Sequence, residues 1–313
     1  MKSLVIVESG AKAKKIKGYL DSNFPDKEWQ VEACVGHVRD LADKENAVDP
    51  RDWTNLKWEF SSKGKKVMRE LRKFCKESDF LFLATDPDRE GEAIAWHLCQ
   101  VLKLNEKTTD RIVFHEITKK AIEEALKEPR KVDMNMVHAQ QARQIVDKLV
   151  GFEISPILCK NIRSSLSAGR VQSVALRLIC NREAEIESFH SQEYWSIDTK
   201  FKTQDNKYLI ARLVGLDFNK VGKFDITSEQ ASKEIQERIN KTSFTVISVD
   251  TKRTKRQPSA PFTTSTLQQE ASRKLGFSAS RTMQIAQRLY EGIQVGSETT
   301  GLITYMRTDG VQM

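Results

Sequence analysis

The first 130 residues of the chain alternate between short apolar runs and stretches with helical spacing. The runs at 4–7 and 79–84 carry almost no polar position, which is typical of strands buried on both faces of a sheet. Each precedes a stretch, 11–20 or 90–102, whose apolar residues recur at the spacing of a helix face. Strands that alternate with helices predict a parallel α/β sheet. The expected elements are strand 4–7, helix 11–20, strand 79–84, helix 90–102, strand 111–114 and helix 118–126.

The pattern changes after about residue 130. Residues 133–158 and 169–187 have the spacing of long helices, and residues 194–249 consist of short alternating stretches that predict strands. A basic, proline-bearing linker follows at 251–261, and helical spacing then returns at 265–275 and 278–290. A multidomain chain is therefore expected. Its predicted parts are an α/β domain at 1–132, a helical segment at 133–190, a β-rich segment at 191–256 and the start of another helical domain at 257–313.

Composition limits the possible partners and compartment. The 313 residues carry 51 Lys and Arg against 43 Asp and Glu, and the resulting charge of +8 permits a nucleic-acid partner without proving one. None of the five cysteines has metal-ligand spacing, which indicates free thiols in a reducing compartment. The apolar run at the N-terminus is too short for a signal peptide or a membrane span. We therefore expect a cytoplasmic protein with no membrane partner.

Four carboxylates follow the first two predicted strands. Asp86, Asp88 and Glu90 form the pattern D-x-D-x-E directly after the run 79–84, and Glu8 ends the first strand. Ligands of open α/β sheets bind outside the carboxyl ends of the strands, so the four side chains are expected in one crevice. Oxygen ligands gathered in this way are typical of a Mg²⁺ site. The alternative is a solvated acidic turn whose carboxylates complement the start of a helix.

A Glu after one strand and D-x-D-x-E after another resemble the toprim domain, which serves topoisomerases, primases and nucleases. The resemblance implies that the four carboxylates bind Mg²⁺ and that Glu8 also takes part in proton transfer. The toprim pattern alone leaves several reactions open.

A tyrosine near the end of the chain is the candidate nucleophile. Tyr305 lies in the stretch GLITYMRTD, two residues before Arg307. A phenol with a pKa of ~10 is a poor nucleophile at neutral pH, so its proton must be removed and its charge stabilised. A permanently charged guanidinium nearby suits that task. Taken alone, Y-x-R is also the pattern of a buried strand tyrosine beside a surface arginine.

Three further stretches point to one family together with the tyrosine segment. They are GHVRDL at 36–41, LSAGRVQSVALRL at 166–178 and the run 258–292, and the whole set resembles the type IA DNA topoisomerases of bacteria. The resemblance covers essentially the whole chain. It implies that Tyr305 attacks DNA beside Arg307. It also implies that Lys12 contacts the scissile phosphate and that His37 contacts a phosphate or supports the tyrosine.

The resemblance also implies a set of DNA-binding residues. From the residues alone, the pairs 143/147 and 287/291 are also ordinary partners one helical turn apart, and 170–173 is the first turn of a helix whose N-terminus suits a phosphate. The family usually has Pro where this chain has Gly10, which loosens a turn without removing a functional group. The set comprises Arg143, Asp147, Arg170, Gln172, Ser173, Gln287 and Glu291.

For the complete enzyme, the resemblance implies ATP-independent relaxation of negatively supercoiled DNA. Tyr305 would cut one strand through a 5′-phosphotyrosine bond, and Mg²⁺ would assist religation. The partner would be a single-stranded segment of DNA, and the enzyme a monomer at the bacterial nucleoid. No phosphate loop for ATP is present in the sequence. A toprim nuclease or primase that works without Tyr305, and a non-catalytic DNA-binding fragment, are the alternatives.

The chain ends eight residues after Tyr305. We expect a truncated product that lacks the rest of the tyrosine domain and the return strands of the β-rich arch. Strands within 194–249 would then have unpaired edges, and Tyr305 would fray away from the crevice at Glu8. Such a fragment is expected to bind single-stranded DNA weakly and not to relax a plasmid.

Overall fold

The computed structural model describes residues 1–42, 47–49, 52, 55–296 and 298–307, and its chain divides into two compact units. Met1–Gln172 and Ser259–Met313 form the first unit, and Ser173–Pro258 form the second. This division differs from the four domains expected from sequence, whose boundaries stay predictions.

A parallel sheet of four strands lies at the centre of the first unit. Its order is β2-β1-β5-β6, so the first strand in the chain lies inside the sheet. In the register, Val5 faces Val31 on one side and Phe82 on the other. The α/β fold predicted from sequence is confirmed. The strands are β1 (Lys2–Val7), β2 (Glu28–Ala33), β5 (Phe80–Leu83) and β6 (Asp110–Arg111).

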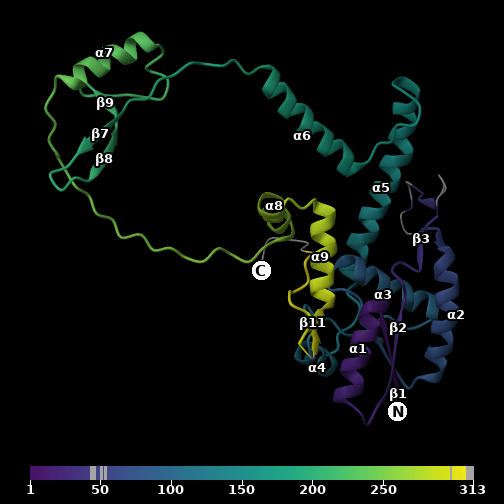
Figure 1. The fold of residues 1–313 in the computed structure, drawn as a ribbon. Coiled ribbons are helices and arrows are strands. Elements are labelled where there is room, and N and C mark those ends of the chain that lie inside the picture. The colour runs from purple at the N-terminus through teal and green to yellow at the C-terminus, as the bar shows by residue number, and fades with distance from the viewer. Residues whose placement is uncertain (43–46, 50–51, 53–54, 297, 308–313) are drawn as a thin grey trace. The chain divides into compact units, whose positions relative to one another are not determined.

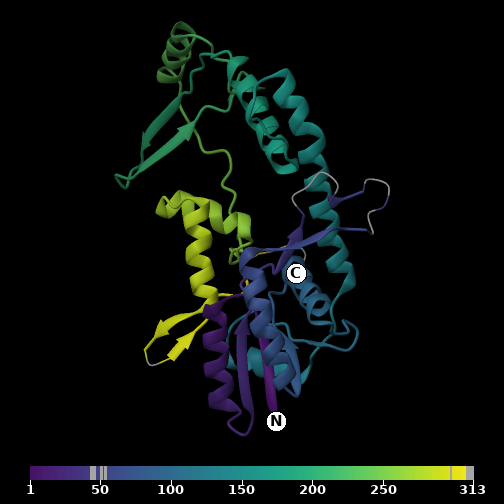
Figure 2. The same cartoon turned by 90° about the vertical axis from the view of Figure 1, so that its right-hand side faces the viewer.

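Helices cover both faces of this sheet (Figures 1 and 2). Alternate side chains of β1 serve the two faces, because successive residues of a strand point in opposite directions. Val5 and Val7 pack with α1 and α4, whereas Leu4 and Ile6 pack with α2 and α3. The helices are α1 (Gly10–Asn23), α2 (Ser62–Glu77), α3 (Arg89–Leu102) and α4 (Lys119–Lys127).

The C-terminal part of the chain joins the same core. Ala286, Tyr290 and Met306 belong to the buried cluster that contains the α1 side of the sheet. Backbone hydrogen bonds link the two segments, from the N–H of Gly301 to the carbonyl of Ile117 at 3.2 Å and from that of Tyr305 to His115 at 2.7 Å. The remaining elements of this unit are β3 (Arg39–Leu41), β4 (Trp58–Phe60), α5 (Met134–Asn161), α8 (Thr264–Leu275), α9 (Ala279–Glu291), β11 (Ile293–Val295) and β12 (Glu298–Thr300).

The second unit contains short antiparallel pairs and one helix of its own. Strand β7 pairs with β8, and β9 pairs with β10. The alternation at 243–249 predicted a further strand, but no residue from 243 to 262 makes a hydrogen bond to another described residue. Alternating apolar and polar residues indicate which face of a strand is buried. A strand forms only where a neighbouring strand accepts and donates its backbone hydrogen bonds. The elements are α6 (Arg170–Glu187, beginning in the first unit), β7 (Asp198–Lys202), β8 (Tyr208–Arg212), β9 (Gly215–Leu216), β10 (Asn219–Lys220) and α7 (Glu229–Asn240).

The predicted helices agree with the structure to within a few residues. The third strand, predicted at 111–114, is the two-residue strand β6 at Asp110–Arg111 in the structure. Among the described residues, every helix is too short or too polar to cross a bilayer.

Candidate active site

A buried ammonium lies between two carboxylates where β1 and β5 end. Glu8 follows β1, and its Oε1 accepts a hydrogen bond from the backbone N–H of Asp86 at 2.7 Å. Ser9 caps α1 and thereby places Lys12 in the first helical turn. The Lys12 side chain is 2% exposed, its Nζ forms an ion pair with Asp86, and it lies 3.9 Å from Oε2 of Glu8. The predicted crevice therefore forms around Glu8, Lys12 and Asp86.

Asp88 connects this crevice to the candidate nucleophile. One carboxylate oxygen, Oδ1, caps α3 by accepting a hydrogen bond from the N–H of Gly91 at 2.8 Å. The other, Oδ2, accepts a hydrogen bond from the hydroxyl of Tyr305 at 2.7 Å. This bond to the backbone of α3 fixes the Asp88 side chain. Its second carboxylate oxygen is therefore held where the tyrosine hydroxyl can reach it.

The segment around Tyr305 is anchored on both sides. The N–H of Tyr305 bonds to the carbonyl of His115, Met306 is buried, and the hydroxyl of Thr264 donates to the carbonyl of Met306 at 2.6 Å. The expectation that Tyr305 frays away from the Glu8 crevice is wrong. Backbone pairing with the segment after β6 and burial of Met306 hold the tyrosine in place.

Burial and neighbouring carboxylates shift two pKa values in the crevice. Burial raises the pKa of Glu8 to about 7; repulsion by Asp86 adds to this, and Lys12 offsets part of it. Burial also raises the pKa of Tyr305, followed by the charge of Asp86 and the hydrogen bond to Asp88, while Arg307 lowers it. The phenol is thus protonated at neutral pH. It would become a better nucleophile if more positive charge entered the crevice.

Glu90, the fourth predicted carboxylate, has a different set of partners. Its Oε2 accepts a hydrogen bond from Nε2 of Gln140 at 3.1 Å and lies 3.3 Å from Nε2 of His37. Arg143 Nη1 lies 3.8 Å from Oε1 of Glu90. The hydrogen bond to Glu90 raises the pKa of His37 despite its burial. The structure therefore brings His37 and Arg143 to Glu90.

Asp147 and Arg170, two predicted DNA contacts, bind each other. The guanidinium Nε and Nη2 of Arg170 lie 2.8 and 3.2 Å from the two carboxylate oxygens of Asp147. Arg143, one helical turn before Asp147, is further away, with its Nε 3.9 Å from Oδ2 of Asp147. The Gln172 side chain lies close over Gly169. Ser173 begins the second unit.

The remaining predicted residues lie beside an opening of about 640 Å³ on the α9 side of the crevice. Gln287 donates to Oε1 of Glu291 at 2.8 Å, and Ser9 donates to the same oxygen at 3.2 Å. This pair therefore ties α9 to the loop after β1. The opening is lined by Glu8, Asp86, Ser280, Met283, Gln284, Gln287, Arg288 and Arg307.

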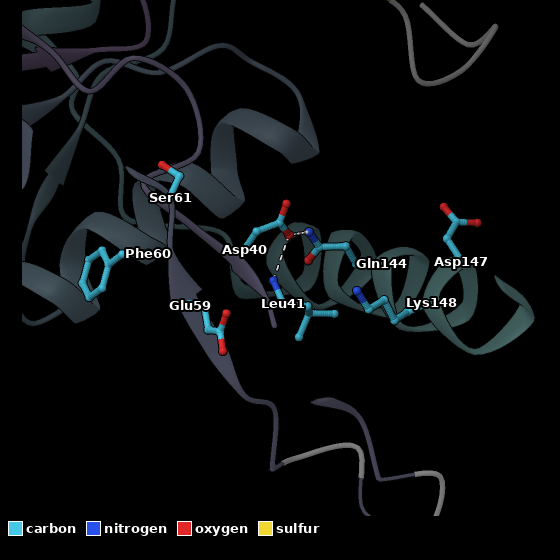
Figure 3. Close-up of a pocket in the computed structure, with 8 residues that line it drawn as sticks. All are labelled: Asp40, Leu41, Glu59, Phe60, Ser61, Gln144, Asp147 and Lys148. Carbon is cyan, nitrogen blue, oxygen red and sulfur yellow. Dashed lines mark hydrogen bonds between the residues drawn. The ribbon is translucent and has the colours of Figure 1, made fainter. Parts of the chain in front are cut away.

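A second opening, of about 540 Å³, lies between the β3–β4 hairpin and α5 (Figure 3). Oδ1 of Asp40 accepts hydrogen bonds from Nε2 of Gln144 and from the N–H of Leu41. Asp147 and Lys148 lie further along α5 in the same view. The Asp147–Arg170 pair is thus at the edge of this opening.

The carboxylates do not form a ready-made metal cage. Among the described residues, no group of three or more His, Cys, Asp or Glu side chains could hold a metal ion as it stands. The donor set nevertheless fits Mg²⁺, because Glu8, Asp86 and Asp88 supply oxygen ligands. Burial raises the pKa of Glu8 most, and repulsion by Asp86 raises it further although Lys12 lowers it.

Sequence reasoning missed the residues that support the loop between β5 and α3. Arg111 is fully buried, and its guanidinium donates to the carbonyls of Thr85 and Asp86 at 3.0 and 2.7 Å. Its Nε donates to the fully buried Glu92 at 2.8 Å. A lone arginine in the apolar stretch RIVF was the available signal.

Tyr290 was missed as well. Its ring is fully buried and lies 5.2 Å from the ring of Tyr305, with an interplanar angle of 67°. The ammonium of Lys12 lies 5.3 Å from the centre of the Tyr290 ring. In the structure Tyr290 belongs to the buried cluster on the α1 side of the sheet.

Comparison with known families agrees with this geometry. A family model described as DNA topoisomerase matches residues 131–313, and one described as Toprim domain matches residues 3–117. The chain belongs to the DNA topoisomerase family, as the motifs predicted.

Individual relatives agree in name and fold. DNA topoisomerase 1 of Rickettsia bellii is 50% identical over 315 residues, covering 99% of this chain and 39% of the relative. DNA topoisomerase 1 of Xylella fastidiosa is 49% identical over 320 residues, covering 100% and 38%. The structure of full-length topoisomerase I from Thermotoga maritima matches with a TM-score of 0.79 and 41% identity, over 98% of this chain and 49% of that one. The chain thus spans about two fifths of the length of these curated relatives.

Proposed function

We propose that this chain supplies the nucleophile and the acidic crevice of a type IA DNA topoisomerase. The complete enzyme would relax negatively supercoiled DNA without ATP, through a transient break in one strand. One observation carries the proposal: the hydroxyl of Tyr305 lies 2.7 Å from Asp88 Oδ2, in the crevice that contains Glu8, Asp86 and Lys12. A nuclease or primase using the carboxylates alone would not need a tyrosine there.

In the proposed cleavage step, Oη of Tyr305 bonds to the phosphorus of a DNA phosphodiester and the bond from phosphorus to the 3′ oxygen breaks. Asp88 Oδ2 already accepts the hydrogen bond from the phenol and is placed to receive its proton. Arg307 and Lys12 supply positive charge for the phosphate oxygens. The energy of the broken bond is kept in the phosphotyrosine, so no ATP is consumed.

Glu8 is proposed to protonate the departing 3′ oxygen. A general acid works best when its pKa is close to the operating pH, and burial beside Asp86 raises the pKa of Glu8 to about 7. Religation is the reverse transfer, in which Glu8 takes the proton back from the 3′ hydroxyl.

Mg²⁺ is the proposed cofactor, held by Asp86 and Asp88 with Glu8 or Glu90. When bound, it would supply charge that offsets the carboxylates and helps to align the religating ends.

The proposed DNA path runs past the predicted binding residues and the opening beside Arg307. The strand is held through its phosphates by Arg143 and Arg170, with Gln172 and Ser173 at the start of α6. A monomeric state and a place at the bacterial nucleoid complete the proposal.

The experiment that tests the reaction uses the complete protein and a labelled single-stranded oligonucleotide. After denaturation, a covalent protein–DNA adduct is expected with the unaltered protein and none with Tyr305→Phe, which should still bind DNA because only a hydroxyl is removed. An adduct that persists in the variant would sink the assignment of Tyr305.

A further inference from the structure

Tyr290 stands out as a buried polar group without a partner. Its side chain is 0% exposed, and its hydroxyl makes no hydrogen bond to any residue that the structure describes. A buried hydroxyl without a partner destabilises the folded state, whereas a phenylalanine would fill nearly the same volume without that cost. The hydroxyl therefore needs an explanation beyond packing.

The surroundings of Tyr290 are the groups that would act on the phosphate. Its ring meets the ring of Tyr305 edge to face at 5.2 Å, and the ammonium of Lys12 lies 5.3 Å from its centre. Burial raises the pKa of Tyr290, and the charges of Asp86 and Glu8 raise it further. The hydroxyl thus keeps its proton and can donate a hydrogen bond as a neutral group.

We propose that the hydroxyl of Tyr290 donates a hydrogen bond to a non-bridging oxygen of the DNA phosphate that Tyr305 attacks. This inference rests on the proposed function, since it requires DNA at Tyr305. An anionic phosphate oxygen would give this unpartnered hydroxyl an acceptor, and hydrogen bonds to charged acceptors are stronger than neutral ones. Neighbouring carboxylates repel such an oxygen, so a neutral donor that adds no negative charge suits the crevice.

The same contact assigns Tyr290 a positioning effect on Tyr305. The edge-to-face contact favours one arrangement of the two rings, so the phosphate held by one phenol is presented to the other. Tyr290 is therefore a phosphate-binding residue of this reaction, separate from the nucleophile.

The test compares stability and DNA binding in Tyr290→Phe. The unaltered 313-residue chain, Tyr290→Phe and the control Tyr208→Phe are titrated with a fluorescent single-stranded oligonucleotide, and the thermal midpoint of each is measured. Tyr208 is an exposed tyrosine of β8 in the second unit. For Tyr290→Phe we expect an equal or higher midpoint together with a Kd weakened by about tenfold, the cost of losing one bond to a charged acceptor. Tyr208→Phe should change neither.

The possible outcomes distinguish failure of this inference from failure of the proposed DNA binding. A higher midpoint with an unchanged Kd would show that the hydroxyl only burdens the core and would overturn the inference. A lower midpoint would also overturn it, because the hydroxyl would then have a partner, such as water, in the protein without DNA. If the unaltered chain binds no oligonucleotide, its proposed DNA binding fails and this inference falls with it. If the chain binds and Tyr290→Phe binds equally well, only the inference fails.

Discussion

The hydroxyl of Tyr305 donates a hydrogen bond to Oδ2 of Asp88 at 2.7 Å, although 217 positions separate the two residues in the chain. Asp88 is fixed by its cap on α3, and Tyr305 by its backbone bond to His115. The contact therefore joins the C-terminal segment to the crevice through two residues that are each held by a hydrogen bond to the backbone. Changes to the carboxylates or to their supports should accordingly alter both chemistry and stability.

The first prediction concerns the acidic pair in the complete protein. Asp86→Asn combined with Asp88→Asn should weaken Mg²⁺-dependent plasmid relaxation much more than single-strand binding, because two anionic oxygen ligands are lost while repulsion of DNA decreases. Asn also keeps the cap on α3. Relaxation measured against Mg²⁺ concentration checks this. An unaltered Mg²⁺ dependence would return the carboxylates to the acidic-turn interpretation.

The second prediction concerns the tight turn between β5 and α3. A Cβ at Gly91 would lie 2.2 Å from the carbonyl oxygen of Asp86, so Gly91→Ala must displace the loop. Overpacking of this kind costs about 1–3 kcal/mol, which urea denaturation would detect. Gly18→Ala is the matched control: nothing lies within 4 Å of a Cβ there, and the exposed middle of α1 should gain about 0.5–1 kcal/mol. Equal effects of both substitutions would contradict the proposed steric cause.

The third prediction uses the buried pair of Glu92 and Arg111. Burial raises the pKa of Glu92, but hydrogen bonds from Arg130 and the charge of Arg111 outweigh it, so the net pKa is lowered. A lowered folded pKa stabilises the protein above the unfolded pKa of ~4.3 and loses that contribution as the pH falls through the folded value. Glu92→Gln should therefore cost about 3–5 kcal/mol at pH 7, and its difference from the unaltered chain should narrow in acid.

Urea midpoints at pH 7 and at pH values below ~4.3 would measure this difference. Glu77→Gln serves as a control, because Glu77 makes only half-exposed ion pairs with Lys2 and Lys73 and should change stability by less than about 1 kcal/mol. A Glu92→Gln deficit that is the same at every pH would argue against the ionised pair.

The fourth prediction concerns the exposed pair of Asp147 and Arg170. Asp147→Asn should free the guanidinium and tighten single-stranded DNA binding by about a few-fold, because one anion is removed and one cation is released. Arg170→Gln should weaken binding and make it less dependent on salt. Titrations at several salt concentrations would check both. Identical affinities for the two variants would exclude this pair from the DNA path.

The fifth prediction is that this 313-residue chain binds single-stranded DNA but does not relax supercoiled plasmid. Relaxation requires both ends of the cut strand to be held while another strand passes. This chain spans about two fifths of the length of its relatives. A plasmid assay with Mg²⁺ decides the matter, and robust relaxation at catalytic enzyme levels would show that these residues suffice.

Local pattern was enough to predict the sheet, the family and most candidate residues. Buried strands and helix faces leave periodic apolar positions, and the residues after parallel strands must meet at one edge of the sheet. Glu8, Asp86 and Asp88 could therefore be placed together from sequence. The family motifs supplied Tyr305 and Lys12, whose side chains the structure also brings to that crevice.

Tertiary packing alone decided which partner each side chain takes. Glu90 shares the D-x-D-x-E motif, yet it faces His37 and Gln140, because α3 turns its first-turn residues in different directions. The stretch 243–249 alternates like a strand, but its residues make no hydrogen bond to a strand among the described residues. No local pattern marked Tyr290, whose ring contacts that of Tyr305 and whose hydroxyl has no partner among the described residues. Periodicity specifies which face of an element is buried, but contacts between distant segments depend on how those faces pack, and no local pattern contains that information.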